Sequence, residues 1–392
     1  MTHYTYLLIG GGMSAGAAVE GIRSMDQEGS IGIITIEANR PYDRPPLSKG
    51  LWKGKTTPDE ILHEMPDGVT LHTECWADTL DIAQKQVTDG EGNQYTYEKL
   101  LLAMGGFPKQ LALSADEDIV YYRTLADYHR LRDLVDTYDS FAVIGGSFIG
   151  SELAAALCRN GKDVTMLFPE EAICAKIFPT DLAGYLNRYY ESMGVHIYPE
   201  TTLAAIEGSL GNYQLSAAQR TTIAADVIVA GIGIRPNTDL AATAGLQVDN
   251  GIVVNDHLQT SAPDIYAAGD VARFQDQVLH EWRRVEHEDN AVTMGKTAGR
   301  AMAGSTETYD HSPMFYSDLF DLGYEAVGHL SAEMDTYIDW QEEYKKGVIY
   351  YLNENRVRGV LLWNVWEQVA AARDLIAAGK QLSPQALRGR LS

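Results

Sequence analysis

The fold is decided by residues 4–16, which read YTYLLIGGGMSAG and take an apolar strand directly into three glycines. A helical stretch and a second strand follow, and the acidic Glu37 stands after that strand, 27 residues beyond Gly10. In such a strand, turn and helix, Gly10 makes the tight turn, Gly12 leaves room for a pyrophosphate at the helix N-terminus, and Ala15 permits close packing. Glu37 is suited to hold an adenosine ribose. The pattern predicts a dinucleotide-binding fold.

The same pattern returns at residues 141–150, FAVIGGSFIG, where Gly145 stands 135 residues after Gly10. A helix and a strand at residues 164–167 follow. Either copy alone could be a glycine-rich turn that only packs a helix on a sheet, but two copies in one chain predict two bound dinucleotides. The candidate ligands in the second turn are Gly145, Ser147, Phe148, Ile149 and Gly150.

The second copy departs from the usual pattern in two ways. Ser147 replaces the middle glycine, although serine is small enough for a phosphate to approach closely. No acid ends the strand directly, but Glu170 lies near enough to accept hydrogen bonds from a ribose 2′-hydroxyl. Residues 164–171 contain no Lys or Arg to bind a 2′-phosphate, and Glu170 and Glu171 should repel it. NADH is therefore favoured over NADPH.

The overall charge excludes one class of partner and weakens another. With 31 Lys and Arg against 54 Asp and Glu, the formal net charge is −23, which repels nucleic-acid phosphates. Nucleic-acid binding is not expected. The same charge slows encounter with acidic electron carriers unless a basic patch attracts them, and only Arg283-Arg284 and Lys345-Lys346 offer one.

Location and metal content are predicted from what the sequence lacks. No apolar stretch approaches the roughly 20 residues of a membrane helix, and residues 1–6 show no basic leader. We expect a cytoplasmic protein with no membrane span. Cys75, Cys158 and Cys174 show neither CxxC nor CxxxxC spacing, so no zinc site, no other metal and no redox-active disulfide is predicted.

Further motifs identify a family. Residues 40–49, RPYDRPPLSK, and residues 260–270, TSAPDIYAAGD, resemble the FAD-dependent pyridine-nucleotide oxidoreductases of the ferredoxin-reductase type. Within that class the chain looks most like the apoptosis-inducing factor family, and the resemblance covers nearly the whole chain. The motifs that carry this closer resemblance are VEHEDNA (285–291), MFYSDL (314–319), GYEA (323–326) and KGVIYYL (346–352).

The resemblance implies roles for particular residues. Lys49 would lie beside the isoalloxazine ring and pair with Glu152, and these two with His287 form the catalytic candidates. Tyr316 stands where the family usually has Trp, which weakens the expected stacking on flavin or nicotinamide. Phe148 would meet the nicotinamide, unless it is only a core residue. The other cofactor-binding candidates are Arg44 (FAD diphosphate), Asp270 (ribityl chain), Arg123, Ala103, Glu286 and Gly233.

The order of the motifs predicts the layout. The FAD motifs open the chain and close at Asp270, so the FAD domain is expected to be discontinuous, at residues 1–115 and 246–306, with an NAD domain inserted at 116–245. Residues 76–97 should form a hairpin insert. Residues 307–392 should form a small α+β domain of four strands and a helix, with Trp363 and Trp366 in its core. The predicted fold class is α/β, with two Rossmann-like, glutathione-reductase-like domains.

Three functions fit these motifs. The first is an FAD-dependent NADH oxidoreductase that passes electrons to an unidentified acceptor, which could be oxygen, a quinone or a small redox protein. The second is an NADH-dependent ferredoxin or rubredoxin reductase. The third is a binding protein whose reduction by NADH controls its conformation or dimerisation. Disulfide reductases and thiol peroxidases are disfavoured, because residues 42–49 contain no cysteine.

Overall fold

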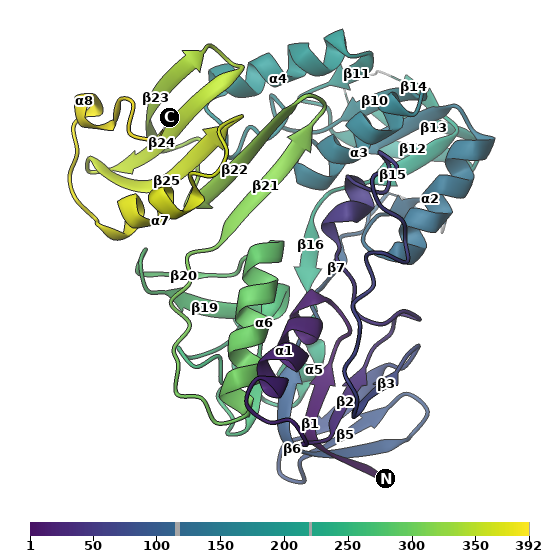
Figure 1. Cartoon of the computed structure of the whole chain (residues 1–392). Coiled ribbons are helices and arrows are strands. Elements are labelled where there is room, and N and C mark those ends of the chain that lie inside the picture. The colour runs from purple at the N-terminus through teal and green to yellow at the C-terminus, as the bar shows by residue number, and fades with distance from the viewer. Residues whose placement is uncertain (114–117, 219–221, 392) are drawn as a thin grey trace. The chain divides into compact units, whose positions relative to one another are not determined.

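The computed structural model describes residues 1–113, 118–218 and 222–391 (Figure 1). The chain forms two compact units, each of which is described by itself. Unit 1 comprises Met1–Arg44, Thr57–Phe107 and Arg235–Met314, and unit 2 comprises Pro45–Thr56, Pro108–Ile234 and Phe315–Ser392. Residues 45–56 thus belong to unit 2, although the sequence places them among FAD motifs. The three-domain division stays a prediction.

A seven-stranded sheet forms the core of unit 1. Its strand order is β3-β2-β1-β6-β5-β4, with β18 also paired to β6. β1 is parallel to β2 and β6, and its Leu7 and Leu8 are fully buried, as expected for a strand covered on both faces. The strands are β1 (Thr2–Ile9), β2 (Ile31–Ile34), β3 (Val69–His72), β4 (Ala77–Asp81), β5 (Gln86–Asp89), β6 (Gln94–Leu102) and β18 (Ile265–Ala267).

The hairpin predicted at residues 76–97 is present, because β4 and β5 pair antiparallel and β5 continues the pairing onto β6. Beyond the main sheet, a smaller one joins three short strands in the order β17-β19-β20. β7 (Gly106–Pro108) and β16 (Ile234–Pro236) lie where the chain passes from one unit to the other. The remaining elements are β17 (Ile252–Val253), β19 (Ala272–Asp276), β20 (Glu281–Arg283), α5 (Asp239–Thr243) and η2 (Gly269–Val271).

Two helices of unit 1, α1 (Met13–Arg23) and α6 (Glu288–Met302), pack against each other almost backbone to backbone (Figure 1). A Cβ added at Gly295 would lie 2.3 Å from the carbonyl oxygen of Ser14, and one at Gly299 would lie 2.2 Å from that of Ala18. From the other side, Gly21 meets the carbonyl of Lys296 at 2.2 Å. Only glycine permits this approach.

Unit 2 contains a five-stranded parallel sheet in the order β11-β10-β9-β15-β8. The helix that precedes its central strand β9 begins with a capping box, in which Thr124 and Asp127 each bond to the other's backbone N–H. A three-stranded antiparallel sheet, β12-β13-β14, adjoins it in sequence. The strands are β8 (Val120–Tyr121), β9 (Ser140–Ile144), β10 (Asp163–Leu167), β11 (Val195–Tyr198), β12 (Leu203–Ser209), β13 (Asn212–Ala217), β14 (Thr222–Ala225) and β15 (Val227–Ala230), and the helices are η1 (Pro45–Ser48), α2 (Leu125–Thr137), α3 (Phe148–Arg159) and α4 (Thr180–Ser192).

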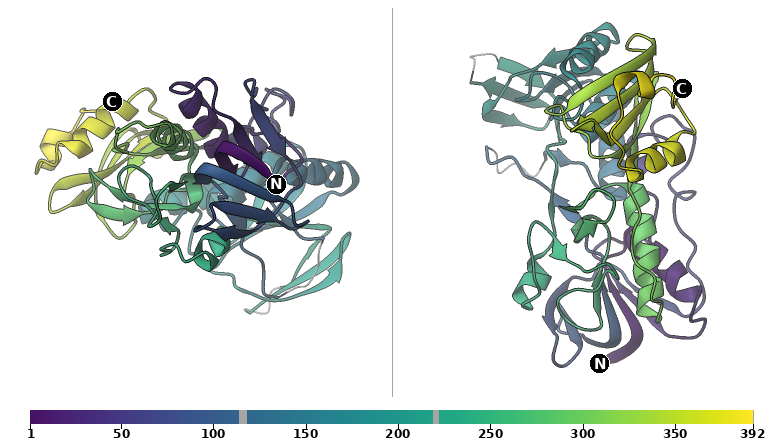
Figure 2. Two further views of the ribbon diagram at one scale, coloured as in Figure 1. Left: turned by 90° about the horizontal axis from the view of Figure 1, so that it is seen from below. Right: turned by 90° about the vertical axis from the view of Figure 1, so that its left-hand side faces the viewer.

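The rest of unit 2 is a five-stranded sheet in the order β21-β22-β25-β24-β23, drawn green to yellow in Figure 2. Trp363 is fully buried as predicted, but the prediction for Trp366 is wrong: it is 49% exposed. It lies beyond the end of β25, where Asn364 and Glu367 both have positive φ, and its ring covers Gly323 from outside. The elements are β21 (Met314–Leu319), β22 (Leu322–Gly328), β23 (Asp335–Glu342), β24 (Lys346–Asn353), β25 (Arg356–Trp363), α7 (Val369–Ala377) and α8 (Pro384–Leu387), of which β21 and α8 were not predicted.

Candidate functional site

The glycine turn of unit 1 has the geometry of a dinucleotide cradle. Gly10 has φ of +108°, and an added Cβ would lie 2.2 Å from the carbonyl oxygen of Ala103, so no other residue fits the turn. At Gly12, the N-cap of α1, a Cβ would instead meet only the guanidinium of Arg44, at 3.7 and 3.9 Å. Ala15, in the first turn of α1, is fully buried. The open space at the helix N-terminus therefore faces a cation, which fits a diphosphate.

The acid and the cation expected to bind FAD are joined in one network. The guanidinium of Arg44 pairs with Glu37, and the hydroxyl of Tyr42 donates to the other carboxylate oxygen of Glu37 at 2.5 Å. Arg44 also donates to that hydroxyl at 3.2 Å. Burial opposes the charge of Arg44, but the Glu37 carboxylate outweighs it and raises the pKa of Arg44. The Arg44 guanidinium beside Gly12 therefore stays charged. Arg44 and Tyr42 together hold the Glu37 carboxylate in place, three residues beyond the end of β2.

The later FAD motif also lies in unit 1. Asp270 is 9% exposed in η2, and a Cβ on the preceding Gly269 would lie 2.2 Å from Oγ of Ser14, so this turn packs against the start of α1. Arg284 donates to the backbone carbonyl of Asp270 at 3.0 Å and pairs with Glu286 at 2.6 Å. His287 is the N-cap of α6.

The second turn, in unit 2, repeats this geometry. Gly145 has φ of +114°, and a Cβ there would lie 2.4 Å from the carbonyl oxygen of Gly231. Gly150 packs just as closely on the backbone of Gly145 itself. Ser147 is exposed at the N-cap of α3, and within the described chain its hydroxyl makes no capping hydrogen bond. An exposed serine hydroxyl therefore stands at the N-cap of α3, and helix N-termini are suited to bind phosphate.

The remaining unit 2 candidates come from several segments of the chain. The ring of Phe148 packs edge-on against Phe315 at 5.5 Å, and its neighbour Ile149 is 38% exposed. Gly233 has φ of +91° in the loop after β15. Arg123 precedes α2, where its backbone N–H donates to Asp127 at 2.9 Å.

Glu170, the residue expected to bind the NADH ribose, has a partner that was not predicted from the sequence. Glu170 pairs with Lys176, with 2.6 Å between the carboxylate oxygen and Nζ. Glu170 is 27% and Lys176 81% exposed. Residues 164–171 contain no Lys or Arg, but the loop after β10 brings Lys176, five residues further along the chain, back to Glu170.

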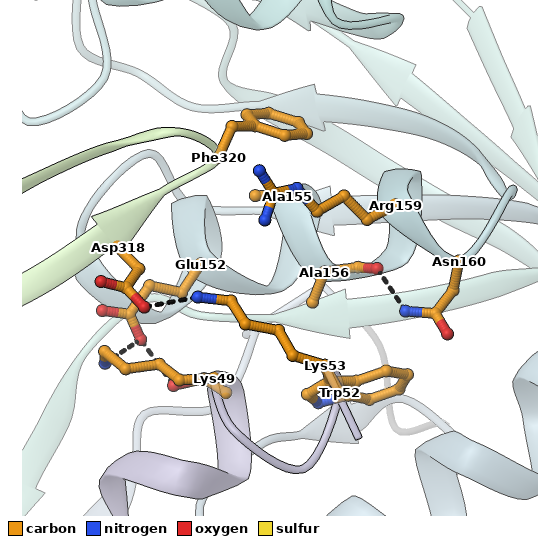
Figure 3. Close-up of a pocket in the computed structure, with 11 residues that line it drawn as sticks. Lys49, Trp52, Lys53, Glu152, Ala155, Ala156, Arg159, Asn160, Asp318 and Phe320 are labelled. Atoms are coloured by element: carbon orange, nitrogen blue, oxygen red, sulfur yellow. Dashed lines mark hydrogen bonds and ion pairs between the residues drawn. The ribbon is translucent and has the colours of Figure 1, made fainter. Parts of the chain in front are cut away.

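The pair expected between Lys49 and Glu152 is present, with 2.7 Å between Nζ and Oε2 (Figure 3). Glu152 is 3% exposed on α3, and Lys49 is 14% exposed just after η1. Two hydroxyls that the sequence did not single out complete the carboxylate's shell: Ser48 donates to Oε2 at 2.5 Å and Ser317 to Oε1 at 2.5 Å. The ammonium of Lys49 also lies 5.2 Å from the ring centre of Tyr316.

A shallow pocket adjoins this pair. Figure 3 shows Lys53 crossing it to Asp318, 2.5 Å away, and Arg159 extending beneath Phe320. Its apolar floor is formed by α3 and the segment after η1. Each cation that lines the pocket, Lys49, Lys53 and Arg159, thus forms an ion pair with an acidic side chain.

The three thiols are poor nucleophiles. Burial, and secondly the charge of Glu152, raise the pKa of Cys174 to about 12. Burial and a hydrogen bond to Asp89 raise the pKa of Cys75 to about 11, and burial also raises the pKa of Cys158. Across residues 1–113, 118–218 and 222–391, no group of three His, Cys, Asp or Glu side chains is arranged to hold a metal, and no helix is long and apolar enough to cross a membrane.

Comparison with known proteins agrees with this architecture. Residues 4–295 match the pyridine nucleotide-disulphide oxidoreductase family, and residues 331–378 match the C-terminal domain of mitochondrion-associated apoptosis-inducing factor. The chain is 34% identical to apoptosis-inducing factor 1 of Dictyostelium discoideum, over 95% of this chain and 78% of that protein. It is 31% identical to putative apoptosis-inducing factor 1 of Drosophila melanogaster, over 97% of this chain but only 64% of that protein.

Among solved structures, the chain resembles putidaredoxin reductase in its covalent complex with putidaredoxin, with a TM-score of 0.91 and 28% identity over 99% of this chain and 96% of that one. The chain therefore belongs to the pyridine nucleotide-disulphide oxidoreductase family. It is an FAD-dependent NAD(P)H oxidoreductase, and the predicted fold class, family and cofactors are confirmed.

Proposed function

We propose that this protein oxidises NADH through FAD and delivers the electrons to an acceptor other than a disulfide. The observation that carries the proposal is the buried Lys49–Glu152 pair. Its lysine ends the segment 42–49, in which a disulfide reductase would need a reactive cysteine and this chain has none. The protonated thiols elsewhere agree with it. When bound, FAD supplies two-electron acceptance and one-electron donation.

Each cofactor has a set of residues suited to it. For FAD, Gly12 and Arg44 would hold the diphosphate, Glu37 a ribose and Asp270 the ribityl chain. For NADH, Gly145 and Ser147 would hold the diphosphate, Glu170 the ribose, and Phe148 and Tyr316 would offer aromatic faces to the nicotinamide. His287, Glu286, Arg123, Ala103, Ile149, Gly150 and Gly233 stay predictions as ligands.

Lys49 has the most direct chemical role in this proposal. Its ammonium is partly shielded from water and fixed by Glu152, so it presents a preorganised positive charge. Such a charge stabilises the negative charge that develops as a flavin is reduced. The protein thereby lowers the barrier by electrostatics, while the two glycine turns supply orientation.

The test is anaerobic stopped-flow reduction of the FAD-loaded protein at saturating NADH. Replacing Lys49 by Ala should leave FAD bound and slow the limiting rate of flavin bleaching by about 10²–10³-fold. Lys53→Ala is the matched control, since Lys53 lines the same pocket and pairs with Asp318 instead. A limiting rate in Lys49→Ala equal to that of the unmodified protein would remove Lys49 from the mechanism.

The likeness to putidaredoxin reductase favours a second candidate, in which the acceptor is a small iron-sulfur protein. Three of the four basic residues that could attract an acidic carrier are paired with acids, and only the exposed Lys346 has no ion pair among the described residues. Arg283 pairs with Asp276 at 2.9 Å, Arg284 with Glu286 at 2.6 Å, and Lys345 with Glu342 at 2.6 Å. We therefore favour a small acceptor such as oxygen or a quinone, and a steady-state screen of acceptors with NADH distinguishes the two.

A third candidate is the NADH-gated binding protein, supported by the similarity to apoptosis-inducing factors. Slow reoxidation by every acceptor, together with an NADH-dependent change in sedimentation, would favour it over an enzyme. The NADH-dependent dimer and the cytoplasmic location stay predictions.

A further inference from the structure

We propose that Ser317 and Ser48 are positioning residues, which hold the Glu152 carboxylate against Lys49 and so fix the cation that serves the flavin. The inference rests on the proposed role of Lys49. It assigns a positioning role to β21, a strand of the C-terminal sheet that lies outside both glycine turns.

The hydrogen bonds occupy both oxygens of one buried carboxylate. Oε2 accepts from Ser48 and Lys49, and Oε1 accepts from Ser317 on its other side. Ser317 is 1% and Ser48 6% exposed, so water does not readily replace either hydroxyl. Because Glu152 cannot turn without breaking one of these bonds, its direction toward Lys49 is fixed.

The carboxylate and its donors come from three distant parts of the chain. Ser48 is 104 residues and Ser317 165 residues from Glu152, so η1, α3 and β21 meet at this carboxylate. Tyr316, the residue before Ser317, faces the Lys49 ammonium. Two consecutive residues of β21 therefore contact the two members of the ion pair.

Two tyrosine hydroxyls interact electrostatically with the carboxylate, and in the described part of the chain the hydroxyl of Tyr324 is buried with no hydrogen-bond partner. The hydroxyl of Tyr190 donates to the backbone carbonyl of Ser151 at 3.1 Å and is thus committed elsewhere. Burial raises the pKa of Tyr190, and the charge of Glu152 adds to the effect. The carboxylate receives its hydrogen bonds from the two serines and from the Lys49 ammonium, and a buried carboxylate that loses such a donor is destabilised.

The experiment uses the FAD-loaded protein and two readouts, the limiting rate of flavin bleaching by NADH and the midpoint potential of the bound flavin. Ser317→Ala should slow the limiting rate about tenfold and lower the potential by about 30 mV, which is a tenfold change for a two-electron couple. Ser48→Ala should act in the same direction. The matched control is Ser151→Ala, because Ser151 is fully buried on the same helix but donates to the Phe148 carbonyl.

A double-mutant cycle with Lys49→Ala separates positioning from mere folding. If the serines act through Lys49, Ser317→Ala should have no further effect on rate or potential once Lys49 is gone. Equal effects in both backgrounds overturn the inference. Normal rate and potential in both serine variants, with Lys49→Ala impaired, overturn it and leave the proposed function standing. A normal Lys49→Ala variant overturns both.

Discussion

The preference for NADH should depend on Glu170 and on the lysine paired with it. In Glu170→Gln the carboxylate that repels a 2′-phosphate is gone, and Lys176 loses its partner. Two unit charges about 4 Å apart interact by about 1 kcal/mol in water and about 4 kcal/mol near a protein surface, so at this partly exposed site we take about 1.5 kcal/mol. Loss of a charged hydrogen bond to the ribose costs NADH about 1.5 kcal/mol more. The two contributions together amount to about 3 kcal/mol. This corresponds to a fall of about 10²-fold in the ratio of kcat/KM for NADH to kcat/KM for NADPH.

The assay is the rate of anaerobic flavin bleaching as a function of each nucleotide's concentration. Glu171→Gln is the control, because it removes the same charge one residue away, from an exposed side chain. If the charge alone mattered, the two variants would change the preference equally. Glu170 does not determine the preference for NADH if Glu170→Gln keeps the NADH-to-NADPH ratio of the unmodified protein. The same conclusion follows if NADPH already reduces the unmodified protein as fast as NADH.

Further predictions concern the acceptor, acid stability and the thiols. An acidic ferredoxin should be a poor acceptor at low salt in a coupled cytochrome c assay, and turnover that climbs steeply as salt is removed would contradict this. Burial would raise the pKa of Asp89, but hydrogen bonds from Asn93, Cys75 and Tyr95 outweigh it and hold the pKa below its usual value. The stability that Asp89 contributes is therefore fully present above about pH 4 and is lost progressively as the pH falls toward the lowered pKa of the folded protein. Asp89→Asn should lower the free energy of unfolding by about 2 kcal/mol at pH 7 but by only about 1 kcal/mol at pH 3, measured by urea titration. An equal loss at both pH values would refute it. Iodoacetamide at pH 8 should label Cys75 and Cys174 only slowly and leave NADH oxidation intact, and rapid labelling by mass spectrometry would show a reactive thiol.

The two dinucleotide folds were predictable because their signals are local. The strand, the glycines and the helix of each copy lie in one continuous segment, at residues 2–23 and 140–159. Gly10 and Gly145 can be identified from sequence because their backbone conformation excludes side chains. The hairpin at residues 76–97 was predictable for the same reason. Short-range patterning also found four of the five C-terminal strands, but β21 was quoted as a motif without being recognised as a strand.

What the sequence did not show depends on contacts between distant segments. Ser317 has no local feature that marks it as a partner of Glu152, and Lys176 meets Glu170 only because of the loop after β10. The neutralisation of Arg283 and Arg284 likewise required the positions of Asp276 and Glu286. Trp366 was misplaced because its apolar sequence neighbours suggested a core, whereas positive φ on either side turns its ring outward.

The contact between α1 and α6 limits how this protein can evolve. At Gly295 and Gly299 the obstacle to a larger residue is a main-chain carbonyl of α1, which every amino acid possesses. A substitution there therefore has no second-site suppressor among the facing side chains, since trimming them creates no room. Relief could come only from moving one helix axis, and that would displace Gly12 or His287 at the helix starts. These glycines should thus be among the least replaceable positions in the chain, although neither is expected to touch a cofactor.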